Sequence, residues 1–230
     1  MYRHEQHIDH PVPCRVMIVD DHRTFTDLVC LALRGEPDLD CVGAAHDPAE
    51  ARVQVARAHP DLVVMDVDLG DEDGDGLDLT AELLGQRPAM LVVVLTAHCD
   101  AGVLRRAAAA GACALLPKGC SLRDLLSGLR HARHGDLFVH PELLRTLVVE
   151  QPDRGRQTAR RPDLTPRETL VLQLLTEGRH VSSIACDLGI SVHTCRGYVK
   201  TLLSKLGAHS QLEAVAIAGK HGLVDAAPRR

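Results

Sequence analysis

The sequence predicts an α/β domain with a parallel sheet, followed by a small domain made only of helices. In the first 150 of the 230 residues, strand-like apolar runs alternate with helix-like segments, which is typical of βαβ units. From Leu164 onward the pattern is helical only. Residues 1–150 carry 14 Lys and Arg against 24 Asp and Glu, a net charge of −10, whereas residues 151–230 carry 12 against 7, a net charge of +5. We therefore expect only the second part to bind a polyanion.

The composition predicts a cytoplasmic protein without a membrane partner. No run of about 18 apolar residues is present. The first residues are polar and rich in histidine, unlike a secretory signal. The eight cysteines form no C-x-x-C pair, which favours reduced thiols over a disulfide framework or a zinc site. We interpret four of them as small core residues, namely Cys30, Cys41, Cys113 and Cys186.

Polar side chains follow four apolar runs of the first domain. The runs are residues 16–19, 62–65, 91–95 and 115–116, and continuous apolar runs of this kind indicate strands buried on both faces of a parallel sheet. The polar residues that follow them are Asp20 and Asp21, Asp66, Thr96 and Lys118. Ligands of such sheets collect at the carboxyl ends of the strands. We therefore expect three carboxylates, a hydroxyl and an ammonium to meet in one crevice.

This set of side chains is suited to a divalent cation and a phosphoryl group. Neighbouring carboxylates repel one another, and Mg²⁺ prefers oxygen ligands. A carboxylate beside Mg²⁺ can attack phosphorus and form an acyl phosphate. Asp66 is the best candidate for that nucleophile because it ends the most apolar of the acidic strands. Lys118 and Thr96 could hold the remaining phosphoryl oxygens.

The sequence of the second domain predicts four helices, two of which form a helix-turn-helix. Thr165-Pro-Arg-Glu168 is a capping box with proline at the first helical position. A short helix over residues 181–188 is followed by a turn at Gly189 and by a longer helix that ends near Leu206. A fourth helix follows Ser210. A short helix, a glycine turn and a longer helix with one polar face are typical of a helix-turn-helix.

The longer helix has one apolar and one polar face. Cys195, Val199 and Leu202 recur at helical spacing and should face the core. The opposite face carries Arg196 and Lys200, four residues apart, so that both project together. Such a face suits the major groove of DNA, where arginine can bond guanine through two hydrogen bonds. Gly197 lowers helix stability by about 1 kcal/mol relative to alanine, and close approach of the backbone to DNA would explain it.

These motifs resemble those of a known family. The segments RVMIVDDH, PDLVVMD, VVVLTAH and AGACALLPK resemble the receiver domain of two-component response regulators. The segments LTPRETLVLQLLTEGR, IACDLGIS and KLGAHSQLEAVAIAGKHGLV resemble the DNA-binding domain of the LuxR/FixJ (NarL) type. The resemblance implies a flavodoxin-like, doubly wound, five-stranded receiver domain over residues 14–149 and a four-helix helix-turn-helix domain over residues 163–226. A disordered tail over residues 1–13 and a linker over residues 150–162 complete this division.

The resemblance also assigns roles to individual residues. It implies that Asp66 is the phosphoacceptor and that Thr96 and Lys118 assist it. The expected Mg²⁺ ligands are Asp20, Asp21, Asp66 and the backbone carbonyl of Asp68. The expected DNA contacts are made to bases by Arg196, Gly197 and Lys200, and near the backbone by Thr194 and Lys205.

The implied function is that of a DNA-binding transcriptional regulator, not an enzyme, controlled by phosphorylation of Asp66. A sensor histidine kinase would be the phosphoryl donor. The other expected partners are promoter DNA, RNA polymerase and, in the active state, a second copy of the chain. Two departures bear on this function: Leu115 stands where the family usually has an aromatic residue, and the loop over residues 69–76 is longer and more acidic than usual.

Three alternatives stay open from the residues alone. Because of those departures, the receiver could control DNA binding without phosphorylation. Asp66-Val-Asp68 after a buried strand also resembles the nucleophile motif of haloacid-dehalogenase-type phosphatases, which would make the protein a Mg²⁺-dependent enzyme. Finally, Asp71-x-Asp73-x-Asp75-Gly-x₅-Glu82 fits the formula of a Ca²⁺-binding EF-hand loop, although a strand and not a helix is expected to precede it.

Overall fold

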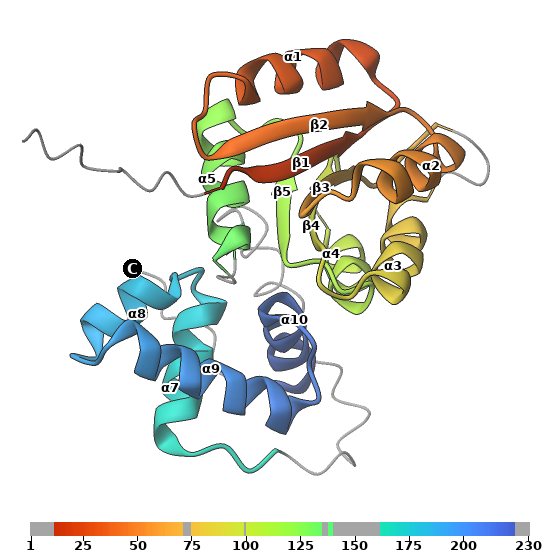
Figure 1. The fold of residues 1–230 in the computed structure, drawn as a ribbon. Helices are drawn as coiled ribbons and strands as arrows, with labels where there is room; N and C mark the ends of the chain where they lie inside the picture. Colours follow the sequence, from red (N-terminus) through yellow and green to blue (C-terminus); the bar gives the residue numbers. More distant parts are fainter. Residues whose placement is uncertain (1–11, 71–74, 99, 135–137, 140–161, 224–230) are drawn as a thin grey trace, which may run out of the picture.

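The computed structural model describes residues 12–70, 75–98, 100–134, 138–139 and 162–223. These residues form an α/β domain and a smaller helical domain (Figure 1). The predicted tail over residues 1–13 falls outside this part of the chain except for its last two residues, and the predicted linker except for Pro162.

The first domain is built on a parallel sheet with the strand order β2-β1-β3-β4-β5-β6. The strands are β1 (Cys14–Val19), β2 (Leu39–Ala45), β3 (Leu62–Asp66), β4 (Leu91–Thr96), β5 (Ala114–Pro117) and β6 (Phe138–Val139). The predicted five-stranded doubly wound sheet is confirmed by strands β1 to β5. The structure adds β6, a two-residue strand beside β5, which is too short to leave a pattern in the sequence.

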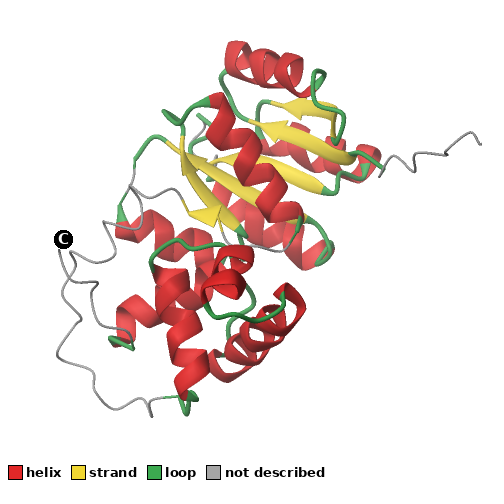
Figure 2. Cartoon of the chain, turned by 90° about the vertical axis from the view of Figure 1, so that its left-hand side faces the viewer, coloured by secondary structure: helices red, strands yellow, loops and turns green. Residues whose placement is uncertain are grey.

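Helices cover both faces of the sheet, as the two views show (Figures 1 and 2). They are α1 (Arg23–Leu33), α2 (Pro48–Ala58), α3 (Gly76–Gln86), α4 (Ala101–Ala109) and α5 (Leu122–Arg133). The side chains of β1 alternate between two hydrophobic clusters. Val16 and Ile18 pack with residues of α1 and α5, and Met17 and Val19 pack with residues of α2, α3 and α4. The strands are therefore buried on both faces, which explains their continuous apolar runs.

The second domain consists of four helices around its own apolar residues. They are α7 (Pro166–Thr176), α8 (Val181–Asp187), α9 (Val192–Leu206) and α10 (Gln211–His221). The predicted capping box is confirmed, because Thr165 and Glu168 each bond the other's backbone N–H. Ser191 caps α9, and Gly207 ends it in the left-handed conformation with φ 67°. The predicted helix-turn-helix is thus formed by α8 and α9.

The two domains pack against each other through α4 and α10. The buried apolar side chains of α4 and of the helical domain belong to one continuous hydrophobic cluster. In the described residues, α10 buries side chains such as Leu212, Ala214 and Val215. No helix in this part of the chain is both long enough and apolar enough to cross a lipid bilayer.

Candidate acidic pocket and nucleic-acid interface

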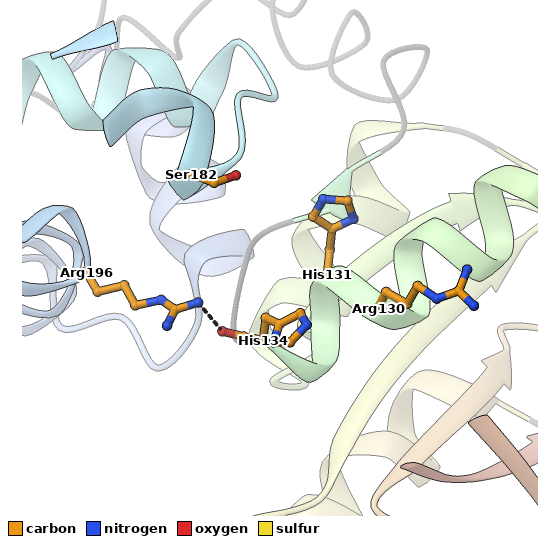
Figure 3. Close-up of a pocket in the computed structure, with 5 residues that line it drawn as sticks. All are labelled: Arg130, His131, His134, Ser182 and Arg196. Carbon is orange, nitrogen blue, oxygen red and sulfur yellow. Dashed lines mark hydrogen bonds between the residues drawn. The ribbon is translucent and has the colours of Figure 1, made fainter. Parts of the chain in front are cut away.

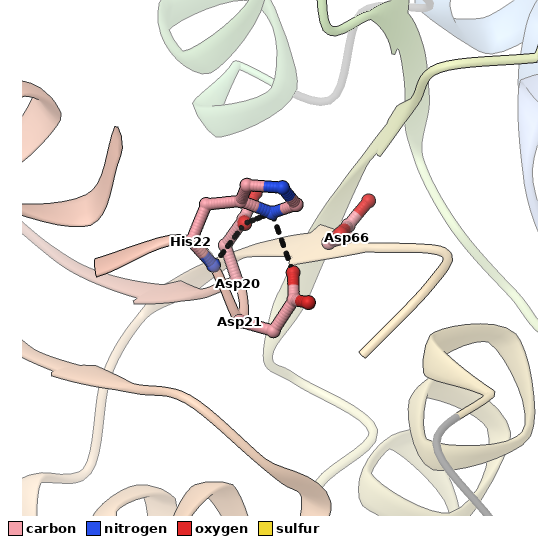
Figure 4. Close-up of side chains that lie close together, drawn as sticks. All are labelled: Asp20, Asp21, His22 and Asp66. Carbon is pink, nitrogen blue, oxygen red and sulfur yellow. Dashed lines mark hydrogen bonds and ion pairs between the residues drawn. The ribbon is translucent and has the colours of Figure 1, made fainter. Parts of the chain in front are cut away.

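An acidic pocket lies at the carboxyl ends of β1 and β3. Asp20 and Asp21 directly follow β1, and Asp66 is the last residue of β3. One ligand atom from each of Asp20, Asp21, His22 and Asp66 lies within 4.8 Å of the others (Figure 4). Asp20 and Asp66 are only 1% and 2% exposed. The parallel sheet therefore brings together the three carboxylates that are far apart in sequence.

Lys118 supplies the positive charge that these buried carboxylates need. Its Nζ lies 2.6 Å from Oδ2 of Asp66 and 3.0 Å from Oδ2 of Asp20. Burial alone would lower the pKa of Lys118, but its contacts with the carboxylates of Asp66 and Asp20 raise it. The ammonium is therefore charged, and it links the ends of β1, β3 and β5 in one ion cluster.

The charge balance of the pocket is incomplete without a cation. Burial raises the pKa of Asp66 to about 6, with Lys118 opposing the shift and Asp20 adding to it. Oδ2 of Asp20 is buried and makes no hydrogen bond, its contact being the ion pair with Lys118. Three carboxylates with one ammonium leave a net negative charge and uncommitted oxygens. This donor set fits a hard divalent cation such as Mg²⁺.

Thr96 and Asp68 lie next to the acidic cluster. Thr96 is 2% exposed and ends β4, where its carbonyl accepts a hydrogen bond of 2.8 Å from the backbone N–H of Lys118. Its hydroxyl donates to the carbonyl of His98 at 2.7 Å. Asp68 follows Asp66 by two residues, and its backbone acts to lower the pKa of the Asp66 carboxyl, so this predicted metal-binding residue borders the pocket through its backbone.

Two residues of the pocket were not predicted from the sequence. His22 places Nδ1 2.6 Å from Oδ1 of Asp21, and this hydrogen bond raises the pKa of the histidine. Gly76 begins α3 against the backbone of Asp66, and a Cβ at this position would lie 1.7 Å from the Asp66 carbonyl oxygen. His22 could have been found in the sequence, because it directly follows the acidic pair. Gly76 could not, because its role depends on a tertiary contact with Asp66.

The EF-hand reading of the acidic loop lacks support in the described residues. Asp71 and Asp73 lie outside them. The side chain of Asp75 caps α3 and pairs with Arg106. Glu82, the last residue of the formula, is held by Arg52 through hydrogen bonds of 2.8 to 3.1 Å. A strand, β3, precedes the loop, so the helix that enters an EF-hand loop is missing at this place.

The predicted DNA-contact residues all belong to α9, which also carries three buried side chains. Cys195, Val199 and Leu202 of α9 are buried, as predicted. The five residues expected to contact DNA are all exposed: Thr194, Arg196, Gly197, Lys200 and Lys205. A Cβ built on Gly197 would meet no atom within 4 Å, so no packing contact within the described chain explains this glycine.

Two of these five residues have additional partners within their own domain. Thr194 approaches the cap residue Ser191, with 2.8 Å between the two hydroxyl oxygens. Lys205 donates to Oε2 of the buried Glu168 at 2.8 Å and to the carbonyl of Asp163 at 3.0 Å. Lys205 therefore ties the end of α9 to the start of α7, in addition to its predicted place near the DNA backbone.

The N-terminal part of α9 lies against α5 of the first domain. Nη2 of Arg196 donates to the carbonyl of His134 at 3.3 Å (Figure 3). A pocket of about 360 Å³ opens between the domains and is lined by Arg130, His131, His134, Ser182 and Arg196. The rings of His131 and His180 stack across this boundary with 3.8 Å between their centroids. A predicted base-contacting side chain is thus held by the receiver side of the molecule.

Comparison with known families identifies the first domain. Residues 16–130, half of the chain, match the family described as "Response regulator receiver domain". The chain belongs to the response regulators. Residues 162–218 of this response regulator match the family "Bacterial regulatory proteins, luxR family". The predicted receiver and LuxR-type domains are therefore confirmed.

Known proteins and solved structures are similar to the chain over most of its length. The chain is 29% identical to DevR/DosR, a DNA-binding transcriptional activator of Mycobacterium tuberculosis, over 89% of this chain and 93% of that protein. It is also 29% identical to the response regulator VraR of Staphylococcus aureus, over 91% and 98% of the two chains. A structure of Salmonella typhimurium RcsB covers 88% of this chain and 96% of its own, with a TM-score of 0.56 and 24% identity. That likeness concerns the fold alone.

These findings identify a DNA-binding transcription factor and not an enzyme. The phosphatase-like reading of Asp66-Val67-Asp68 is therefore not supported. The geometry agrees, because the acidic pair of this response regulator follows β1, before the strand that carries Asp66.

Proposed function

We propose that transfer of a phosphoryl group to Asp66 from a sensor histidine kinase controls DNA binding by this response regulator. The observation that carries the proposal is the buried Asp66 carboxylate, which shares Lys118 with Asp20 and lies beside Asp21. Asp66 is therefore held in place by Lys118, and the pocket around it carries more negative than positive charge. A divalent cation that binds together with the phosphoryl group would offset the negative charge of the carboxylates and of the phosphoryl oxygens.

The residues of the pocket have complementary tasks in the transfer. An Asp66 oxygen forms the new bond to phosphorus while the bond between phosphorus and the histidine nitrogen of the kinase breaks. Lys118 neutralises charge on the phosphoryl oxygens, starting from a position 2.6 Å from Asp66. Thr96 would exchange its hydrogen bond to the His98 carbonyl for one to a phosphoryl oxygen. This exchange would move the segment after β4 and so transmit the modification.

Mg²⁺ is the cation that best suits this pocket. The side chains of Asp20, Asp21 and Asp66 and the backbone carbonyl of Asp68 would hold it. When bound, it would neutralise the charge that develops on the transferred group. The buried and incompletely bonded Oδ2 of Asp20 supports this assignment.

The output step that we propose is release of α9 from the receiver domain. Arg196 is bonded to the His134 carbonyl, so it would have to leave this partner to reach a base. Once free, Arg196, Gly197 and Lys200 would meet base edges in the major groove, and Thr194 and Lys205 would lie near the phosphates. Phosphorylation would act by shifting the population from the docked to the released arrangement.

In the released state we infer a homodimer on promoter DNA that acts on RNA polymerase. Two helix-turn-helix domains related by a two-fold axis would read half-sites about one helical turn apart. One solved structure similar in fold to this chain is described as two RcsB dimers bound to two parallel DNAs. That description concerns RcsB, and it supports the dimer proposed for this chain as a precedent.

Incubation of the full chain with acetyl phosphate and Mg²⁺, followed by intact-mass measurement, tests the proposal. We expect the wild type to gain one phosphoryl group and Asp66→Asn to gain none. The exposed Asp78→Asn is the matched control and should gain the same group as the wild type. Phosphorylation should also strengthen binding to a promoter fragment in a gel-shift titration. A gain by Asp66→Asn equal to that of the wild type, or no gain by the wild type, would overturn the proposal.

A second candidate is a receiver domain that regulates DNA binding without phosphorylation. The observation in its favour is Leu115, a buried aliphatic side chain where the resemblance leads one to expect an aromatic ring. Without a ring to reorient, the usual relay from Thr96 is absent. This candidate gains support if the wild type takes up the phosphoryl group but its DNA affinity does not change.

A further inference from the structure

An aromatic ring lies beside the lysine of the acidic pocket. The Nζ atom of Lys118 lies over the ring of Phe25, 5.9 Å from the ring centroid. Phe25 belongs to the first turn of α1, is partly buried and packs against the hydrophobic cluster that includes Val16 and Ile18. A cation at this distance from an aromatic face is attracted by the negative potential of the ring. Phe25 is therefore an uncharged partner of an ammonium that otherwise contacts carboxylates.

Aromatic side chains are rare in this chain, so the position of this one is informative. The sequence has two phenylalanines, two tyrosines and no tryptophan. Tyr198 belongs to α9 of the helical domain and Phe138 to the short strand β6, whereas Tyr2 lies outside the described residues. At position 115, where the resemblance leads one to expect a ring, the side chain is a buried leucine. Phe25 is the aromatic side chain that the described part of the chain places at the pocket.

Hydrogen bonds of the pocket fix the place of Phe25. Oδ1 of Asp20 accepts a hydrogen bond of 2.9 Å from the backbone N–H of His22. The carbonyl of His22 in turn accepts a hydrogen bond of 2.9 Å from the backbone N–H of Phe25. The other oxygen of Asp20, Oδ2, lies 3.0 Å from Nζ of Lys118. One carboxylate therefore holds both the helical turn that carries the ring and the ammonium that lies over it.

The ring is the partner of Lys118 that phosphorylation leaves unchanged. In the described residues, Nζ contacts the carboxylates of Asp66 and Asp20 and the ring of Phe25. In the proposed function Asp66 becomes an acyl phosphate, so that its carboxyl group no longer carries a charge, and Asp20 is one of the proposed Mg²⁺ ligands. Both ion pairs of the ammonium are therefore weakened in the phosphorylated state, whereas the ring offers the same face before and after transfer.

We propose that Phe25 is a positioning residue, whose ring holds the ammonium of Lys118 beside Asp66 while the two ion pairs of that ammonium are exchanged. This inference rests on the proposed phosphorylation of Asp66. The ring acts through Lys118, which neutralises charge on the phosphoryl oxygens during transfer, and not on the phosphoryl group itself. Loss of the ring should therefore slow the transfer step and leave the binding of the phosphoryl donor unchanged.

The first experiment measures by intact mass how fast the full chain is phosphorylated by acetyl phosphate with Mg²⁺. Phe25→Leu keeps an apolar side chain without the ring face. It should lower the rate constant at saturating acetyl phosphate about threefold and leave the half-saturating concentration unchanged. Phe25→Tyr retains the ring and should keep the wild-type rate, as should the control Leu28→Ala, at a 61% exposed side chain of the same helix. A wild-type rate in Phe25→Leu, or a change in half-saturation alone, would overturn the proposal.

The second experiment tests the contact without any phosphorylation. In a double-mutant cycle of urea unfolding without metal, Phe25→Leu is introduced into the wild type and into Lys118→Met. Because the ring attracts the ammonium, the substitution should raise the unfolding equilibrium constant about threefold more in the wild type than in Lys118→Met. Equal effects in the two backgrounds would overturn the proposal even if Asp66 takes up the phosphoryl group. Failure of the wild type itself to gain a phosphoryl group would overturn the proposed function, and with it the role of the ring in transfer, whatever the cycle shows.

Discussion

The acidic pocket and the exposed face of α9 hold their charges in opposite ways. In the pocket, Asp20 and Asp66 are 1% and 2% exposed, and both depend on the ammonium of Lys118. On α9, Arg196 and Lys200 are exposed to solvent, and Arg196 also donates to the backbone carbonyl of His134. Buried charges must be balanced by other groups of the protein, whereas water solvates charges at the surface.

This difference separates the effects on folding stability, expected at the pocket, from the effects on DNA binding, expected at α9. Changes in the pocket should alter folding stability as well as chemistry, because they leave a buried charge without compensation. Changes to the exposed Arg196 and Lys200 of α9 should alter DNA binding and leave folding unaffected. The four predictions below test this division, from the largest expected effect to the smallest.

Lys118→Met should have the largest effect on stability. It leaves Asp20 and Asp66 buried without their cation, which we expect to cost about 3 kcal/mol in the free energy of unfolding at pH 7.5 without metal. Without Lys118, the pKa of Asp66 should rise above about 6, so acidification neutralises this carboxyl and the deficit shrinks. Urea unfolding at several pH values measures both effects. Lys220→Met, at an exposed lysine of α10, should change stability little, and equal losses in the two variants would contradict the prediction.

Arg196→Ala should weaken specific DNA binding by the released state, although it also removes the hydrogen bond that holds α9 to the His134 carbonyl. Loss of a bidentate contact to a base costs about 1–3 kcal/mol and relaxes the choice at one base pair. Gel-shift titration of the phosphorylated protein, on a fragment that it selects from random DNA, measures the loss. The exposed Arg167 of α7 offers the control Arg167→Ala. An equal loss on unselected DNA would show that Arg196 meets only phosphates.

Glu168→Gln should have an intermediate effect, confined to the helical domain. The buried Glu168 bonds Lys205 and the backbone N–H of Thr165, and Lys205 contributes most to the lowering of its pKa. Because the pKa of Glu168 is lower in the folded protein than its ordinary value of 4.5, the ionised carboxylate stabilises the fold above pH 4.5. This stabilisation is lost as the pH falls through the pKa of the folded state. At pH 7 the variant should lose about 1 kcal/mol, and its deficit should shrink toward pH 3.

Thermal unfolding of Glu168→Gln at pH 7 and pH 4 measures this loss. Glu177→Gln, at the exposed end of the same helix, is the control and should change stability by less than the variant. If both variants responded alike to pH, the burial of Glu168 would have no special role.

Arg52→Ala should have the smallest effect, although the ion pair that it removes has good geometry. Arg52 holds Glu82 through hydrogen bonds of 2.8 to 3.1 Å, but the two side chains are 48% and 37% exposed. Solvent screens such pairs, so we expect a loss below about 0.5 kcal/mol that disappears at high salt. A loss as large as that of Lys118→Met would show that burial does not decide the strength of these ion pairs.

Local patterns in the sequence predict much of the fold. The apolar runs before Asp20, Asp66 and Thr96 predict the central strands, and capping residues predict the helical domain closely. The convergence of the carboxylates and Lys118 also follows from the sequence, because parallel strands bring their carboxyl ends to one edge.

Contacts between distant segments escape the sequence. The docking of Arg196 on His134 depends on how two domains pack, which no local period encodes. The strand β6 is too short to leave a period at all.

The contact between Gly76 and the Asp66 carbonyl has a consequence for the variation that this receiver can accept. A single methyl group at position 76 would overlap the backbone of Asp66, because its carbon would lie 1.7 Å from the Asp66 carbonyl oxygen. The absence of a side chain at position 76 is therefore what allows the start of α3 to pack against the backbone of Asp66. A saturation library at this codon, screened for regulated transcription, should return glycine and no other amino acid.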